Sequence, residues 1–163
     1  MEGGYYDQIA SGYDELHGEE QLSKAKFILQ NLEVKPSDVL LDVGCGTARA
    51  LSVFGCEKVG IDPSFELLKL AKIPVVQGVA EKLPFPANAF DVVLSITAIH
   101  HFSDIKQALL EMMRVSRRDV VISVFKKAQK FKEIEEAIMS ALPVHKRIEE
   151  TYDVVFLARK TFG

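Results

Sequence analysis

The sequence predicts an α/β fold in which helices cover both faces of a largely parallel sheet. Short apolar segments of strand length alternate with segments of helical periodicity, which is the pattern of consecutive strand–helix–strand units. The segment 39–43 is apolar at almost every position, as expected for a strand that is buried on both faces. The chain has 163 residues and no linker or repeat divides it, so we expect a single domain over residues 1–163.

The first half of the chain begins with a predicted amphipathic helix between Gly18 and Leu32. Its apolar residues recur three or four positions apart, which places them on one helix face. After this helix the pattern predicts, in order, strand 39–43, a short helix over 47–54, strand 58–61, a short helix over 65–72 and strand 75–79.

The second half continues the alternation but ends in a different way. The pattern predicts strand 90–96, a helix over 105–112, strand 119–125 and a helix over 131–142. Pro143 ends the last helix because proline lacks the N–H group that a helix interior requires. The closing segment 145–160 reads as two strands around a tight turn, so we expect it to add an antiparallel strand to the sheet.

Composition excludes several classes of protein. Hydrophobic residues make up 48% and charged residues 26% of the chain, which excludes a disordered tail or a fibrous repeat. The net charge of −3 does not favour a dedicated duplex-binding protein, which is normally basic. Cys45 and Cys56 form neither a disulfide framework nor a zinc-binding spacing, so we expect no metal. No signal peptide or membrane span is recognisable, which predicts a cytoplasmic protein without membrane contact.

A glycine-rich turn, Gly44-Cys45-Gly46, directly follows the first strand, and such turns are typical of nucleotide sites. Glycine lets backbone N–H groups approach a ligand where a Cβ atom would collide. The dinucleotide fingerprint requires a third glycine where this chain has Arg49, and the GxxxxGK loop of triphosphate-binding proteins is absent. Neither a pyrophosphate nor a triphosphate ligand is therefore well supported.

Two carboxylates indicate a different ligand. Asp42 lies inside the apolar first strand, where a carboxylate is costly unless it is paired. An anion there would repel a pyrophosphate and would suit a ligand with an ammonium group. Asp62 ends the second strand, where a carboxylate can accept hydrogen bonds from both ribose hydroxyls. A ligand with a ribose, an adenine, an amino group and no phosphate is S-adenosylmethionine.

These segments together resemble the class I S-adenosylmethionine-dependent methyltransferases, of the small type-11-like kind. VLLDVGCGTARAL resembles their first motif, VGIDPS their acidic second motif, and QGVAEKLPFPANAFDVVLS their adenine-side loop and fourth strand. YYDQIASGYDELH is similar to their N-terminal lid, and IHHFSD is weakly similar to the tRNA wobble-uridine carboxymethyl methyltransferases. The resemblance covers nearly the whole chain in the expected order.

The resemblance implies a Rossmann-like, mostly parallel sheet of seven strands in the order 3-2-1-4-5-7-6, with minimal insertions. Residues 1–35 would form the N-terminal lid and helix. By position, the cofactor would be held by Tyr13, Asp42, Gly44, Cys45, Gly46, Thr47, Asp62, Pro63, Ser64, Ala80, Glu81, Ser95 and Ile96. The family often has Asp or Asn where this chain has Val79, so adenine recognition would rest on backbone groups. Ala48 stands where the family frequently has a third glycine.

Methyl transfer is an in-line displacement, so alignment of the nucleophile supplies much of the rate. A base is needed only where the nucleophile carries a proton, and His100, after the fourth strand, is the candidate for that role. A packed ring in a capped turn is the structural alternative for His100. Lysines 126, 127, 130 and 132 follow the fifth strand at the same edge, where they would suit an anionic acceptor or form a solvated surface.

The sequence thus predicts methyl transfer to a small molecule or to tRNA. One alternative is a non-catalytic methyltransferase-like scaffold that needs a partner, and another is a nicotinamide dehydrogenase, against which Asp42 and Arg49 argue. The implied strand order leaves 75–79 as an exposed apolar edge, and such edges pair readily with another chain. Because some relatives dock a small zinc-containing activator there, we expect a partner of this kind along that edge.

Overall fold

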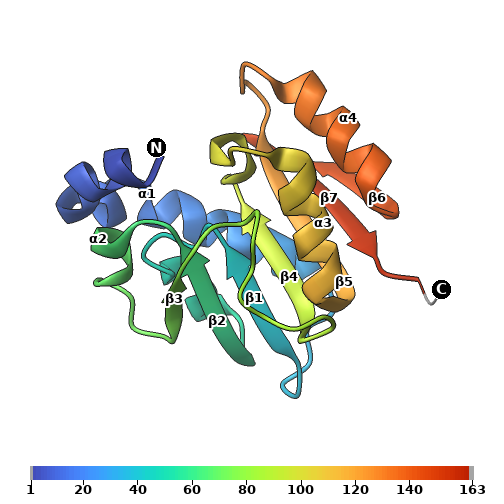
Figure 1. Cartoon of the computed structure of the whole chain (residues 1–163), viewed down its shortest axis with the longest axis horizontal. Helices are drawn as coiled ribbons and strands as arrows, with labels where there is room; N and C mark the ends of the chain where they lie inside the picture. The colour runs from blue at the N-terminus through green and yellow to red at the C-terminus, as the bar shows by residue number, and fades with distance from the viewer. Residues whose placement is uncertain (1, 162–163) are drawn as a thin grey trace.

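In the computed structural model, seven strands form one sheet between two layers of helices (Figure 1). The structure describes the backbone of residues 2–161 and the side chains of residues 17–161. The strands are β1 Val39–Val43, β2 Glu57–Asp62, β3 Val75–Gln77, β4 Phe90–Ile96, β5 Ser116–Phe125, β6 Val144–Glu149 and β7 Asp153–Arg159. The helices are α1 Glu2–Asn31, α2 Phe65–Leu68, α3 Ile105–Val115 and α4 Phe131–Ala141, with 3-10 turns η1 Arg49–Val53 and η2 Ile99–His101. None of the helices in this described part has the length and apolar content needed to cross a membrane.

The sheet order is β3-β2-β1-β4-β5-β7-β6, which confirms the predicted fold class. Strands β1 to β5 pair in parallel, and β7 pairs antiparallel with both β5 and β6. The closing hairpin therefore provides the antiparallel part of the sheet, as its short turn requires. The five parallel strands all direct their carboxyl ends to one edge of the sheet.

Strand β1 shows why this sheet needs helices on both faces. Successive side chains of a strand point to opposite faces, so a strand at the centre of the sheet fills two cores. Leu40 belongs to the core cluster under α1, whereas Leu41 and Val43 belong to the cluster under α3 and α4. All three side chains are buried. The nearly continuous apolar sequence of β1 is thus the consequence of its central position.

Several elements differ in length from the prediction. Helix α1 begins at Glu2 instead of Gly18, because the glycines at 3, 4 and 12 lower helix propensity and concealed its first half in the sequence. The helix predicted over 47–54 is the 3-10 turn η1. The helix predicted over 65–72 ends at Leu68, and the strand predicted over 75–79 ends at Gln77.

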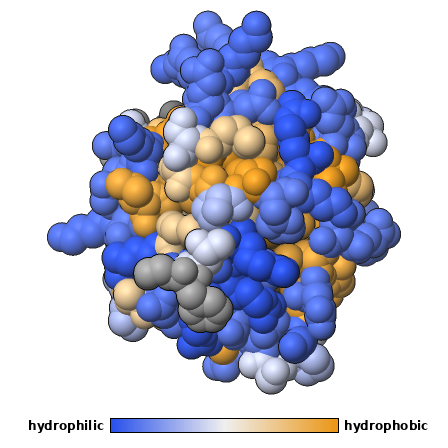
Figure 2. Space-filling view, turned by 90° about the vertical axis from the view of Figure 1, so that its right-hand side faces the viewer, coloured by the Kyte–Doolittle hydropathy of each residue, from blue (hydrophilic) through white to orange (hydrophobic). Residues whose placement is uncertain are grey.

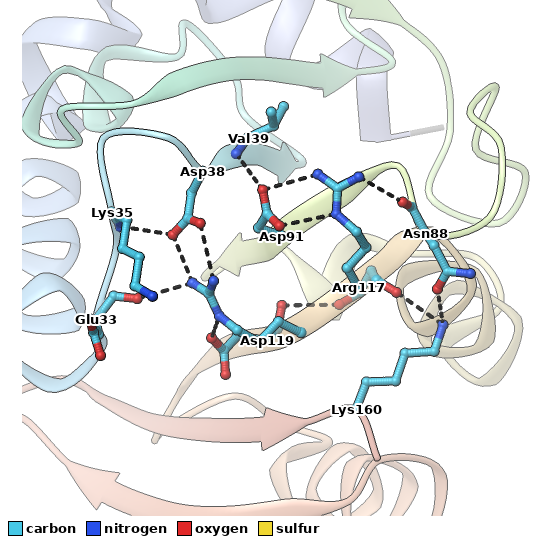
Figure 3. A network of polar contacts seen from close by, with 11 residues as sticks. Glu33, Lys35, Asp38, Val39, Asn88, Asp91, Arg117, Asp119 and Lys160 are labelled. Carbon is cyan, nitrogen blue, oxygen red and sulfur yellow. Dashed lines mark hydrogen bonds and ion pairs between the residues drawn. The ribbon is translucent and has the colours of Figure 1, made fainter. Parts of the chain in front are cut away.

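Ion pairs and hydrogen bonds connect the strands at the amino edge of the sheet (Figure 3). This edge lies opposite to the glycine turn. The Arg118 guanidinium donates two hydrogen bonds to the Asp38 carboxylate, at 3.1 and 2.8 Å, and one to Asp119 at 2.8 Å. Arg117 donates two to Asp91, both at 3.0 Å. Because these arginines lie at this edge, they form no continuous basic surface with the lysines after β5.

Arg118→Met should destabilise the fold by about 2–4 kcal/mol at pH 7, because it leaves the buried carboxylate of Asp38 without its cation and that of Asp119 with Arg159 alone. The hydrogen bonds from Arg118 lower the pKa of Asp38 below its ordinary value. The stabilisation is therefore present above about pH 4 and is lost as the pH falls through the folded pKa. Urea unfolding at pH 7 and pH 3 measures both effects.

The exposed Lys106 provides the control for this measurement, because its side chain forms no ion pair with any residue that the structure describes. Lys106→Met should leave the free energy of unfolding within about 0.5 kcal/mol of wild type. A loss in Arg118→Met that is as large at pH 3 as at pH 7 contradicts the charge-pair explanation.

Candidate functional site

A cavity of about 390 Å³ opens at the carboxyl ends of β1, β2 and β4, under the cover of α1. Ligand pockets in proteins have volumes of roughly 300–1,000 Å³, so the cavity can hold a small cofactor. Ten of the predicted site residues line it: Asp42, Gly44, Cys45, Thr47, Asp62, Pro63, Ala80, Glu81, Ile96 and His100. The residues are far apart in the sequence, and the parallel strands bring them to one edge.

The glycine turn wraps over the end of β2. The backbone N–H groups of Gly44 and Cys45 both donate to the Ile61 carbonyl, at 2.8 and 3.0 Å. Gly44 has a φ of +81°, in the left-handed region that favours glycine. A Cβ atom on Gly44 would lie 2.6 Å from the Cβ atom of Ala98, which follows β4. Position 44 therefore requires glycine both for its conformation and for this close approach.

Ala48 retains the backbone shape for which the family commonly uses glycine. Its φ is +62° and its ψ is +13°, so a residue with a Cβ atom occupies the left-handed region. This conformation costs roughly 1–2 kcal/mol for an L-residue other than glycine. The replacement thus preserves the course of the loop into η1 and introduces local strain.

Asp62 joins the glycine turn to the turn after β2. Its Oδ2 atom accepts a hydrogen bond from the Gly46 N–H at 2.9 Å, and its Oδ1 atom accepts one from the Ser64 N–H at 2.8 Å. The contact with Ser64, two residues on, is a turn that aspartate forms often, so Asp62-Pro63-Ser64 carried a recognisable signal for it. The bond to Gly46 had no such signal, because it joins two separate strands.

Asp42 is a buried carboxylate that lacks a hydrogen-bond partner. Its side chain is 3% exposed, and among the described residues nothing donates to its Oδ1 atom. Burial, with a smaller contribution from the charge of Asp62, raises the pKa of Asp42 to about 7. A cationic donor that enters the cavity beside Asp42 would satisfy this acceptor and restore its charge.

Cys45 is a packing residue in this arrangement. Burial raises the pKa of its thiol well above the ordinary value, and the charges of Asp42 and Asp62 raise it further. A Cβ atom on Gly60 would lie 2.5 Å from the Cys45 Sγ atom, so the thiol fills the space that the glycine leaves. A thiol held in its neutral form is a poor nucleophile.

The loop after β3 contributes Val79, Ala80 and Glu81 to the wall of the cavity. Val79 lines the cavity and is 42% exposed, and its side chain offers no hydrogen-bonding group. The Glu81 carboxylate accepts a hydrogen bond from the Asp104 N–H at 3.1 Å, beside the start of α3. Glu81 therefore also connects this loop to the helix that follows η2.

Four predicted residues do not line the cavity or lie outside the described side chains. Ser95 is fully buried within β4, and its hydroxyl has no partner among the described residues. Ser64 caps α2, where its hydroxyl accepts a hydrogen bond from the Leu67 N–H at 3.2 Å. Gly46 contacts Asp62 behind the loop. Tyr13 lies in α1, and its side chain is outside the described residues.

The structure adds residues that sequence reasoning missed. Gly18, Gln21, Arg49, Thr97 and Ala98 also line the cavity, as does His101, which the sequence offers beside His100 as a candidate base or substrate contact. The guanidinium of Arg49 passes so close to Gly18 that a Cβ atom there would collide with it. A glycine inside a helical pattern was the available signal for this close approach. The rings of His100 and His101 lie 4.0 Å apart between centroids.

The chain is similar in sequence to known proteins. The methyltransferase domain family matches residues 41–124, a little over half of the chain. A Methanocaldococcus jannaschii protein, MJ1252, is 36% identical over 119 residues, which cover 71% of this chain and 47% of that protein. Demethylmenaquinone methyltransferase of Staphylococcus carnosus is 33% identical over 129 residues, which cover 68% of this chain and 53% of that protein. This chain spans about half the length of the curated relatives it matches.

A solved structure shows the same fold. It is a chain of the Haloferax volcanii complex between the Trm112 methyltransferase activator and a methyltransferase. The two chains superpose with a TM-score of 0.82 at 18% identity, and the match covers 94% of this chain and 96% of the other.

Asp42→Asn should stabilise the folded chain at neutral pH. In wild type the folded state keeps Asp42 protonated up to about pH 7, while the unfolded state ionises it near pH 4, so its contribution to stability falls between these values. The difference between the folded and unfolded pKa values of Asp42 corresponds to roughly 4 kcal/mol. As the pH rises from 4 to 8, the free energy of unfolding of the variant should therefore increase by about 2–4 kcal/mol relative to that of wild type. Urea unfolding as a function of pH measures this.

The exposed Glu136 offers a matched carboxylate on α4, and Glu136→Gln should track wild type at every pH. An Asp42→Asn variant that parallels wild type from pH 4 to 8 contradicts the raised pKa of Asp42.

Proposed function

Since the chain belongs to the class I S-adenosylmethionine-dependent methyltransferase family, we propose that it transfers the methyl group of this cofactor to a small-molecule or tRNA acceptor. The observation that carries the proposal is the unpartnered acceptor atom of Asp42 in the wall of the cavity. Of the common adenosine cofactors, S-adenosylmethionine presents an ammonium group and no phosphate. When bound, it supplies an activated methyl group on a sulfonium.

The residues at the cavity fit the two ends of this cofactor. In the proposal, Asp42 receives the ammonium, and Gly44, Cys45 and Thr47 hold the methionine part. Asp62 receives the ribose hydroxyls. Its two oxygens accept from the backbone N–H groups of Gly46 and Ser64, and an ionised carboxylate has about four acceptor positions in all.

The adenine end fits a hydrophobic slot. Ala80 and Glu81 lie along it, Pro63 is beside the ribose, and Ile96 closes the base of the cavity. Because Val79 offers only apolar surface, specificity for the adenine amine falls to backbone groups of this loop. His100 lines the same cavity, and in the proposal it contacts the acceptor or takes its proton.

The acceptor side carries cationic and aromatic groups. Phe125, Lys126, Lys127 and Tyr152 line an open hollow at the same edge of the sheet, which Glu19, Glu20 and Glu150 also line. The aromatic rings and the lysines suit an acceptor with a planar ring or an anionic substituent, whereas the glutamates oppose a strongly anionic one. The similarity to demethylmenaquinone methyltransferases supports a small ring-containing acceptor, and the exposed lysines after β5 support an anionic one such as tRNA.

A partner along β3 is the second part of the proposal. Three large apolar side chains near this edge, Phe65, Leu70 and Val79, are about half exposed, and α2 packs beside β3. The opposite edge strand, β6, exposes His145, Lys146 and Arg147, and the side of the molecule that carries it is mostly hydrophilic (Figure 2). Charged edges resist pairing with other chains, whereas short apolar edges favour it.

We propose a small zinc-containing activator as this partner, because a methyltransferase of the same fold forms a complex with the Trm112 activator. The alternative function, a non-catalytic scaffold subunit, is favoured by the absence of a polar side chain at Val79 and predicts weak cofactor binding.

Cofactor binding tests the proposed function. Isothermal titration should give a micromolar Kd for S-adenosylmethionine and no binding of NAD. Because the ammonium pairs with ionised Asp42, affinity should rise up to about eightfold from pH 6 to 7.5 and level off where the ammonium of the ligand loses its proton near pH 8. Asp42→Asn should bind at least about tenfold more weakly at pH 7.5, with a flat pH dependence below pH 7.5.

Glu136→Gln should reproduce the wild-type titration. Binding of NAD in preference to S-adenosylmethionine, or equal affinity of Asp42→Asn and wild type, overturns the proposed cofactor site. Absence of binding of either ligand supports the scaffold alternative.

Partner binding is tested with the Trm112 activator of Haloferax volcanii. The two chains should co-elute in size-exclusion chromatography and raise the Tm of this chain. Leu70→Glu should abolish co-elution by placing a charge on the apolar edge, whereas Leu110→Glu, an equally exposed leucine on α3, should not. Co-elution that survives Leu70→Glu and fails with Leu110→Glu would assign the contact to a different face.

A further inference from the structure

A buried lysine of α1 reaches the carboxyl edge of the sheet. The Lys24 side chain is 4% exposed, and its Nζ atom donates to the Thr97 hydroxyl at 2.8 Å. The same Nζ atom lies 3.3 Å from a carboxylate oxygen of Asp153 and 3.1 Å from one of Glu20. Lys24 thus connects α1 to the residue that follows β4 and to the first residue of β7.

Asp153 and Ser123 hold Thr97 from the other sides. The Asp153 side chain is fully buried, and one of its carboxylate oxygens accepts a hydrogen bond from the Thr97 hydroxyl. The Thr97 N–H donates to the Ser123 carbonyl at 3.1 Å and to its hydroxyl at 3.0 Å. Both the side chain and the backbone of Thr97 are therefore fixed by residues from three other elements.

Thr97 needs these contacts because its backbone is strained. Its φ is +50°, in the left-handed region that a β-branched residue rarely adopts. Such a conformation persists only where the surroundings enforce it, and it is found preferentially at functional sites. Ile96, Thr97 and Ala98 all line the cavity.

The strained turn lies close against the glycine turn. Directly after Thr97, Ala98 lies against the glycine turn, where a Cβ atom on Gly44 would be only 2.6 Å from the Ala98 Cβ atom. A relaxed backbone at Thr97 would move Ala98 and change the space between the ends of β1 and β4. A continuous line of contacts therefore runs from Lys24 through Thr97 and Ala98 to Gly44.

We propose that Lys24 is a positioning residue of the cofactor site: with Asp153, it holds Thr97 in the left-handed conformation that keeps Ala98 against Gly44. The inference rests on the proposed function, since it concerns the same cavity. A buried ion pair is weak evidence for a role in stability, because apolar residues of similar size stabilise a fold as well or better. Helix α1 has its own apolar anchors in Ala25 and Ile28, and Leu32 directly after it is buried in the same core.

The experiment removes the buried pair as a unit. Lys24→Met/Asp153→Leu replaces both charged side chains by apolar ones of the same branching, so the chain should fold with a Tm within a few degrees of wild type. Hydrogen exchange at the amides of Thr97 and Ala98 should accelerate at least tenfold, and the Kd for S-adenosylmethionine should rise about tenfold. Lys24→Arg, which keeps the cation, should stay within threefold of the wild-type Kd.

Lys26→Met is the matched control, because Lys26 is an exposed lysine on the same helix. It should change neither exchange nor affinity. Thr97→Gly provides a second route: it keeps the Lys24–Asp153 pair and frees the backbone, so it should fold and also bind the cofactor about tenfold more weakly.

Unchanged cofactor affinity in the folded double variant, or in Thr97→Gly, overturns the positioning role of Lys24 while the proposed function stands. A wild-type chain that does not bind S-adenosylmethionine overturns the proposed function and the positioning role together. The two failures are therefore distinguishable in one set of titrations.

Discussion

Gly44 and Ala98 meet where β1 and β4 end, and this contact determines the shape of the site. Neighbouring parallel strands are only about 4.8 Å apart, so the turns that leave their carboxyl ends compete for the same space. The chain resolves the competition with a residue that lacks a side chain on one turn and a left-handed threonine on the other. The cavity exists because both turns then bend away from the sheet.

The pKa values of carboxylates at the two edges of the sheet are shifted in opposite directions. At the amino edge, hydrogen bonds from arginines lower the pKa values of Asp38 and Asp91. At the carboxyl edge, burial without a cation raises that of Asp42. The arginine pairs hold the strands together at the amino edge, whereas Asp42, unlike Asp153 beside Lys24, keeps an acceptor ready for a cationic ligand at the carboxyl edge. The contrast in pKa separates the edge that stabilises the fold from the edge that fits a cofactor.

The outer strands differ in a similar way. The short strand β3 has exposed apolar neighbours, and β6 presents charged side chains. A parallel sheet is buried on both faces, so its edges are the places where it can add another chain. Only the β3 edge combines unpaired backbone groups with apolar surface among the described residues, and it lies on the same side of the sheet as the proposed adenine slot.

Periodicity and turn chemistry by themselves determined the alternation of strands and helices, the glycine turn, and the positions of Asp42 and Asp62 at the ends of their strands. These features are local, because they depend on residues within a few positions of one another. The resemblance carried by those motifs determined the strand order and the cofactor class. The length of α1 was hidden because the glycines in its first half lower helix propensity locally.

Only the tertiary structure decided which side chains meet. Lys24 and Thr97 are 73 positions apart, and Asp62, at the end of β2, is 16 positions from Gly46 in the turn after β1. It also placed Ser95 inside the sheet and Arg49 over Gly18. The physical reason is that the free energy of such contacts depends on burial and on partners from distant elements, neither of which leaves a pattern along the chain.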